Sequence, residues 1–158
     1  MHESRSRSDA DQEVVRRGTV SWLTHPPGGR ARIEAESLAF HALPVSEPEE
    51  DPVPHEATPG ELLAITHAMF LAGVLSDALA RAGSPANEIV VDAACTLTGR
   101  AQDRRLARID FQARGRVPGL DSAAFREAVV EARHKSLHSI AVREDLPGET
   151  HAELETSG

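Results

Sequence analysis

The chain has 158 residues, one cysteine and a formal net charge of -8. That length suffices for one domain with its own core, and a single cysteine excludes an internal disulfide. Because nucleic acids and anionic membranes are bound through clustered Lys and Arg, the acidic balance argues against both as partners.

The N-terminal stretch, residues 1–12, is charged and serine-rich and has no apolar periodicity. We therefore expect a disordered tail, followed by a single domain at 13–158. No secretory signal pattern is present, and no apolar run is expected to be long enough to span a bilayer. These features predict a soluble, cytoplasmic protein.

Alternating apolar residues predict three antiparallel strands in the N-terminal part of the domain. The strands are expected at 14–23, 30–37 and 38–43, with a turn at Pro26–Gly29 between the first two. The following stretch, 44–57, is acidic and proline-dense, which predicts an exposed loop without regular structure.

A long helix is predicted over 59–82 by strong signals at both ends. Thr58 and Glu61 form a Thr-x-x-Glu capping box, Pro59 suits the first helical position, and Gly83 suits the end. Apolar residues surround the helix on nearly every side, which predicts a central, buried helix.

The remaining sequence predicts a hairpin and a second helix. The expected elements are strands at 88–98 and 105–117, a helix at 122–136, a short helical piece at 137–142 and a last strand at 149–155. Asp121 can cap the second helix, which is expected to break near Ser136. One stripe of this helix is apolar and consists of Phe125, Ala128, Val129 and Ala132.

This order of elements predicts an α+β fold with helices packed on antiparallel sheets. A helix that is apolar all round needs more cover than one small sheet provides. We therefore expect a homodimer that shares its core.

Four segments of the sequence resemble the OsmC/Ohr family of small dimeric thiol peroxidases, which reduce organic hydroperoxides. They are ATPGELLAITHAMFLAGVLSDAL, EIVVDAACTLTG, RVPGLDSAAFREAVVEARHKS and LHSIAV. The resemblance covers about residues 14–155 and implies an OsmC-like fold, with antiparallel sheets on a long central helix and a second helix in an intertwined homodimer.

The same resemblance implies that the peroxidase machinery is missing. Phe70 stands at the position of the family's reactive cysteine, Ser136 at that of its resolving cysteine and Gly60 at that of its glutamate. Only the arginine is kept, as Arg30 after Gly28 and Gly29. Because peroxide reduction needs a thiolate, we expect the family's reaction to be lost.

By position, the family's interface pocket would gather eight residues of this chain. The expected catalytic residues are His67, His138 and Arg30, and the expected ligand pocket consists of Met69, Phe70, Ser136, His55 and Glu56. Apolar walls with a few polar groups suit a small organic molecule. His67 also has the simpler interpretation of a hydrogen-bonded core residue, and Arg30 that of a solvated turn residue.

Neither a metal nor another cofactor is expected. His134 and His138 are four residues apart, as in helical zinc sites, but the sequence offers no third ligand. Ser136 with His138 lacks the nucleophile elbow and the orienting acid of a hydrolase.

Three functions remain open on the sequence. The first is a redox-inactive OsmC-like protein that binds a small apolar or acidic organic molecule. The second is a repurposed enzyme of specialised metabolism, with acid/base catalysis by His67, His138 or Arg30. The third is a hydroperoxide reductase that works through Cys95, although this cysteine matches no catalytic position and suits a buried strand site.

Overall fold

The structure is a computed structural model that describes residues 15–23, 30–46, 53–100, 103–139 and 147–152. The chain divides into two compact units, Met1–Leu62 and Leu63–Gly158, and each is described by itself. The expected tail at 1–12 lies outside the described residues, so the tail and the single domain at 13–158 stay predictions.

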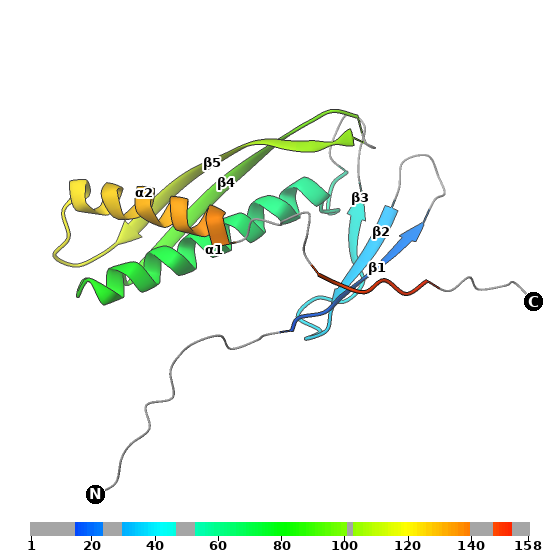
Figure 1. The fold of residues 1–158 in the computed structure, drawn as a ribbon, viewed down its shortest axis with the longest axis horizontal. Helices are drawn as coiled ribbons and strands as arrows, with labels where there is room; N and C mark the ends of the chain where they lie inside the picture. The colour runs from blue at the N-terminus through cyan, green and yellow to red at the C-terminus, as the bar shows by residue number, and fades with distance from the viewer. Residues whose placement is uncertain (1–14, 24–29, 47–52, 101–102, 140–146, 153–158) are drawn as a thin grey trace, which may run out of the picture. The chain divides into compact units, whose positions relative to one another are not determined.

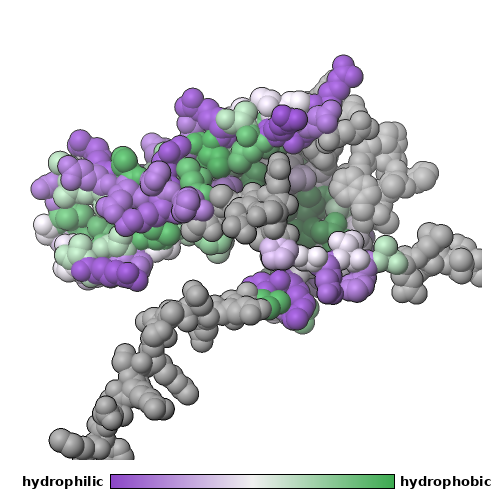
Figure 2. All heavy atoms as spheres, in the orientation of Figure 1, coloured by the Kyte–Doolittle hydropathy of each residue, from purple (hydrophilic) through white to green (hydrophobic). Residues whose placement is uncertain are grey.

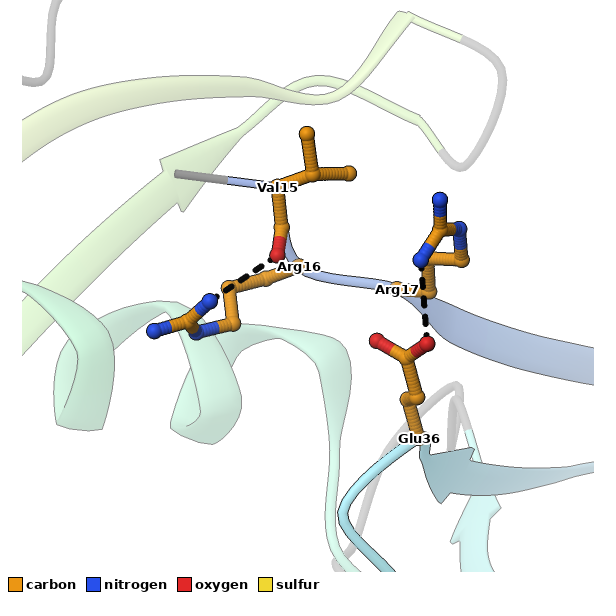
Figure 3. Close-up of polar contacts among 4 residues, drawn as sticks. All are labelled: Val15, Arg16, Arg17 and Glu36. Carbon is orange, nitrogen blue, oxygen red and sulfur yellow. Dashed lines mark hydrogen bonds and ion pairs between the residues drawn. The ribbon is translucent and has the colours of Figure 1, made fainter. Parts of the chain in front are cut away.

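Unit 1 contains an antiparallel sheet in the order β1-β2-β3 (Figure 1). Its strands are β1 Gly18–Leu23, β2 Arg30–Ala35 and β3 Leu43–Ser46. Beyond the last residue pair of β1 and β2, Arg17 and Glu36 point toward one another and form an ion pair of 3.0 Å (Figure 3). The expected turn at Pro26–Gly29 lies outside the described residues.

The third strand begins five residues later than predicted. Residues 38–42 form turns and bends, because Leu38 and Ala42 have left-handed φ angles of 58° and 53° that a strand cannot contain. The prediction of no regular structure from residue 44 is also wrong. Pro44 lies inside β3, where its carbonyl accepts a hydrogen bond from Ala57 N at 3.1 Å.

Unit 2 contains most of α1 and all of β4, β5 and α2. These elements are α1 Pro59–Arg81, β4 Glu88–Thr98, β5 Arg105–Arg116 and α2 Ser122–Ser139. The predicted hairpin is confirmed, and both helices lie along one side of it (Figure 1). Hydrophilic residues cover much of the visible side of α2, and hydrophobic residues lie between α2 and the hairpin (Figure 2).

The buried centre of unit 2 lies between the helices and the hairpin. It consists of Leu71, Leu75, Leu79 and Ala132. The predicted stripe of α2 is confirmed, because Phe125, Ala128 and Val129 pack against this cluster. The opposite face of the hairpin is polar and carries ion pairs such as Arg114–Asp92 at 3.0 Å.

The predicted limits of α1 are confirmed to within one residue, but the single chain does not bury the helix on nearly every side. Gly83 follows the helix with a φ of 82°, and the Gly83 and Ser84 amides donate to the carbonyls of Ala80 and Leu79. In one chain only the leucine stripe is buried, while Ile65, Met69 and Phe70 are exposed. The single chain therefore does not bury the helix on nearly every side, and its burial in the expected homodimer stays a prediction.

The prediction of a helix break near Ser136 is also wrong, because α2 continues through Ser139. Residues 137–139 of the expected short helical piece therefore belong to α2, and residues 140–142 lie outside the described part. The expected last strand is absent from its described residues, 149–152, which have no regular structure.

The expectation that no apolar run is long enough to span a bilayer also needs a correction. The 23-residue helix α1 is long and apolar enough to cross a membrane by length and composition. The core helix of a soluble protein passes the same test. Leu71, Leu75 and Leu79 are buried in the core of unit 2, which is the arrangement of such a core helix.

Candidate functional site

The start of α1 is held by the capping box that the sequence predicts. Thr58 N donates to Glu61 Oε2 at 2.7 Å, and Glu61 N donates to Thr58 Oγ1 at 3.2 Å. Two otherwise unpaired amides of the first turn are satisfied in this way. The box fixes where the helix begins and therefore which faces His67, Met69 and Phe70 occupy.

His67 extends the buried leucine stripe of α1 toward its N-terminus. It precedes Leu71, Leu75 and Leu79 at intervals of four residues, and residues at this spacing share a helix face. The residue is half-buried, and its Nδ1 atom is buried and has no hydrogen-bond partner among the described residues. An unsatisfied buried polar atom costs about 1–3 kcal/mol, so this nitrogen is available to a polar group that enters the site.

Three exposed apolar residues lie on other sides of the same helix. The exposed fractions are 56% for Ile65, 69% for Met69 and 45% for Phe70. His67 and Phe70 are three residues apart and are therefore neighbours on the helix surface, whereas Met69, two residues from His67, lies on nearly the opposite side of the helix. The structure thus brings together two of the predicted site residues, His67 and Phe70, and does not place Met69 beside His67.

Ser136 and His138 lie on α2 and differ in accessibility. Ser136 is 1% exposed, and its Oγ donates to the carbonyl of Arg133 at 3.1 Å, so the hydroxyl is engaged by its own helix. His138 is exposed, as is His134 one turn before it. Within the described parts of the chain, no group of three or more His, Cys, Asp or Glu residues could hold a metal ion.

Arg30, His55 and Glu56 belong to unit 1. Arg30 is the first residue of β2, and its side chain lies outside the described part of the structure. His55 is exposed and has a left-handed φ of 64°, while Glu56 is half-buried and its amide donates to the carbonyl of Val53 at 3.2 Å. Their place in a common pocket with α1 stays a prediction.

Cys95 lies in β4, opposite Ile109 of β5. It is half-buried, and burial raises the pKa of its thiol. A reactive cysteine needs the opposite shift, which neighbouring cations or a helix N-terminus provide. The environment therefore favours a neutral thiol, in agreement with a packing role.

Ile65 was not among the predicted site residues. Its position four residues before Met69 was the available signal, because residues at that spacing share a face of a helix. The interpretation of α1 as buried on all sides hid this exposed face.

The fold defines an α+β domain of the OsmC/Ohr type. It is similar to an organic hydroperoxide resistance protein from Elizabethkingia anophelis, with a TM-score of 0.63 and 15% identity over 85% of this chain and 91% of that one. An OsmC-like protein of unknown function from Vibrio cholerae gives a TM-score of 0.59 and 11% identity over 80% of this chain and 90% of that one. An organic hydroperoxide resistance protein from Legionella pneumophila gives a TM-score of 0.59 and 13% identity over 85% of this chain and 93% of that one.

Sequence comparison alone does not find this relationship. No model of a known protein family matches the chain, and no curated protein matches it in sequence. The OsmC/Ohr-like fold expected from the four sequence segments is confirmed by the solved structures. At 11–15% identity these structures show the fold and carry no assignment of activity.

Proposed function

We propose that the chain is a redox-inactive OsmC-like protein that binds a small apolar or acidic organic molecule against α1, in a pocket closed by a second copy of the chain. The observation that carries this proposal is the buried Nδ1 of His67, which has no hydrogen-bond partner among the described residues and lies beside the exposed side chain of Phe70. Apolar walls with one oriented polar atom are the usual composition of a small-molecule site.

Loss of the peroxidase reaction is supported by the residues themselves. Position 70, where the resemblance places the reactive thiol, is Phe, and Gly60 and Ser136 replace the glutamate and the second cysteine. Neither an apolar ring nor a buried hydroxyl bonded to Arg133 can attack a peroxide. Because burial raises the pKa of the Cys95 thiol, this remaining cysteine is a poor replacement.

The proposed second copy is supported by the exposed face of α1. Ile65 and Met69 lie one helical turn apart, and Phe70 is exposed further around the helix, so α1 exposes several large apolar side chains that soluble proteins usually cover. A homodimer would bury this face and enclose His67. Arg30 is then the proposed partner of a ligand carboxylate, since its planar fork matches that group.

A second candidate, an acid/base enzyme, is favoured by the same His67 atom. An imidazole nitrogen without a partner in an apolar setting can accept or donate a proton during a reaction. His138 is exposed on α2 and is less suited, because water competes for its nitrogens. Arg30 would orient the substrate in this mechanism.

Calorimetric titration with decanoate, which joins an apolar chain to a carboxylate, tests the binding proposal, and decanol is the matched ligand without the charge. We expect saturable binding of decanoate that Phe70→Asp abolishes. Val130→Asp is the matched control, because Val130 is 69% exposed on α2. Absence of binding to either ligand, or equal loss in both variants, would contradict the proposal.

A further inference from the structure

Unit 1 contains a further group of polar residues, none of which belongs to the proposed function. One face of the β1–β2 sheet contains a hollow of about 160 Å³. The polar residues that line it are Thr19, Ser21, Arg32, Glu34 and His41. Pockets that enclose whole drug-sized ligands measure about 300–1,000 Å³, so this hollow suits one functional group or a very small molecule.

The strand register explains why these residues meet. Thr19 lies opposite Glu34, and Ser21 lies opposite Arg32. Alternate residues of a strand share a face, so all four side chains project from the same side of the sheet. His41 joins them from the turn that follows β2, where its Nδ1 lies 2.8 Å from Glu34 Oε2.

Hydrogen-bond donors outnumber available acceptors in this hollow. The guanidinium of Arg32 and the hydroxyls of Thr19 and Ser21 have no hydrogen-bond or ion-pair partner within the described residues. The one carboxylate that lines the hollow, Glu34, is already engaged by His41. This contact also fixes the imidazole and leaves its Nε2 for another partner.

We propose that the hollow binds the carboxylate of a small organic acid. A carboxylate matches the planar fork of Arg32, which donates two parallel hydrogen bonds to such a group. The hydroxyls of Ser21 and Thr19 supply further donors at the same face. Because Glu34 is engaged by His41, the Arg32 guanidinium is left to supply the positive charge that an anion requires.

The backbone of the turn between β2 and β3 supports this assignment. Leu38 and Ala42 flank His41 with left-handed φ angles of 58° and 53°, each of which costs about 1–2 kcal/mol for a residue with a side chain. Hydrogen bonds from Leu38 N to Ala35 O and from Ala35 N to Phe40 O hold the turn. Strained backbone of this kind is concentrated at binding and catalytic sites, and here it brings His41 to Glu34.

Two contacts hold the start of this turn, where the chain leaves β2. The Arg17 side chain donates a hydrogen bond to the Glu36 carboxylate at 3.0 Å and forms an ion pair with it (Figure 3). The Glu36 amide donates to the Arg17 carbonyl at 3.1 Å. The Glu36 carboxylate is therefore occupied outside the hollow. This attachment fixes the first residue of the turn against the residue that precedes β1.

The test is an NMR titration of the full-length protein with sodium acetate, with inorganic phosphate and with sodium chloride at equal ionic strength. We expect saturable shifts at Thr19, Ser21 and His41 with acetate, and about tenfold weaker binding in Arg32→Gln, because the bidentate contact is lost. Arg105→Gln is the matched control, since Arg105 is an exposed arginine of β5.

The outcomes separate the proposal from its alternatives. Shifts that are as large with chloride, or that Arg32→Gln leaves unchanged, would overturn it, and tighter binding of phosphate would overturn the choice of a carboxylate. If Arg32→Gln does not fold, Ser21→Ala gives the same comparison by removing one donor. The shifts are read at Thr19, Ser21 and His41 and the variant is at Arg32, none of which belongs to the α1 site, so failure of one proposal leaves the other standing.

Discussion

Gly115 of β5 lies directly under the ring of Phe125 from α2. A Cβ atom at Gly115 would lie 2.7 Å from Cε2 and 2.8 Å from Cζ of that ring. Contacts this short do not occur in real structures, so the hairpin and α2 approach one another because residue 115 has no side chain.

Gly115→Ala is therefore expected to destabilise the protein by about 1–3 kcal/mol, because the ring of Phe125 must move out of its packed position. Urea unfolding of the variant measures the loss. In the double variant Gly115→Ala/Phe125→Leu the smaller side chain relieves the clash, so the two effects should not add. If the changes in the free energy of unfolding of the two single variants simply add in the double variant, residues 115 and 125 do not clash.

Thr58→Ala is expected to lower the free energy of unfolding by about 1 kcal/mol, because it removes the acceptor for the Glu61 amide at the start of α1. Thr58→Ser keeps the hydroxyl and should retain most of the stability. Thermal or urea unfolding of the two variants gives the comparison. An equal loss in both would mean that the cap contributes nothing.

Cys95 should react slowly with iodoacetamide in the folded protein. Burial raises the pKa of its thiol, so less thiolate exists at a given pH, and the rate should rise only at higher pH than in the urea-unfolded chain. Mass spectrometry of alkylated protein across a pH series measures the displacement. Faster alkylation of folded than of unfolded protein at neutral pH would show an activated cysteine.

Met69→Glu should shift the protein from dimer to monomer. Met69 is 69% exposed on the apolar face of α1, and a charge buried in an interface core costs several kcal/mol when it is unpaired. Val130→Glu places the same charge on α2 at an equally exposed position and should leave the dimer intact. Sedimentation equilibrium reports the masses, and a wild-type monomer would contradict the proposed pocket.

Features that depend on neighbouring residues were predictable from the sequence. The capping box of Thr58 and Glu61, the glycine end at Gly83 and the Asp121 cap, whose Oδ1 accepts from Ala124 N at 2.8 Å, all occur as expected. Each depends on residue types within four positions of one another, where the chemistry of a single turn decides.

Features that depend on tertiary context were predicted less well. The alternation at 38–43 favoured a strand, but left-handed Leu38 and Ala42 carry no distinctive sequence signal, because neither is Gly, Asn or Asp. The helical period of α2 did not reveal that the helix continues through Ser136. There the buried hydroxyl bonds to the carbonyl of Arg133 and so needs no break in the helix.

The candidate site was predictable only in part. The fold resemblance indicated which positions of α1 would matter, and His67 and Phe70 are indeed neighbours on that helix, whereas Met69 lies on nearly the opposite side from His67. The hollow at Arg32 and His41 had no such signal, because strand register and a strained turn bring its residues together.

The most direct test of the central claim is reduction of cumene hydroperoxide by the purified protein with dithiothreitol, beside a Cys95→Ser variant. The account predicts no consumption of peroxide above the buffer rate in either sample, because position 70 holds a phenylalanine and the Cys95 thiol stays neutral. Peroxide reduction by the wild type that disappears in the variant would contradict it and show that Cys95 is a working peroxidatic thiol.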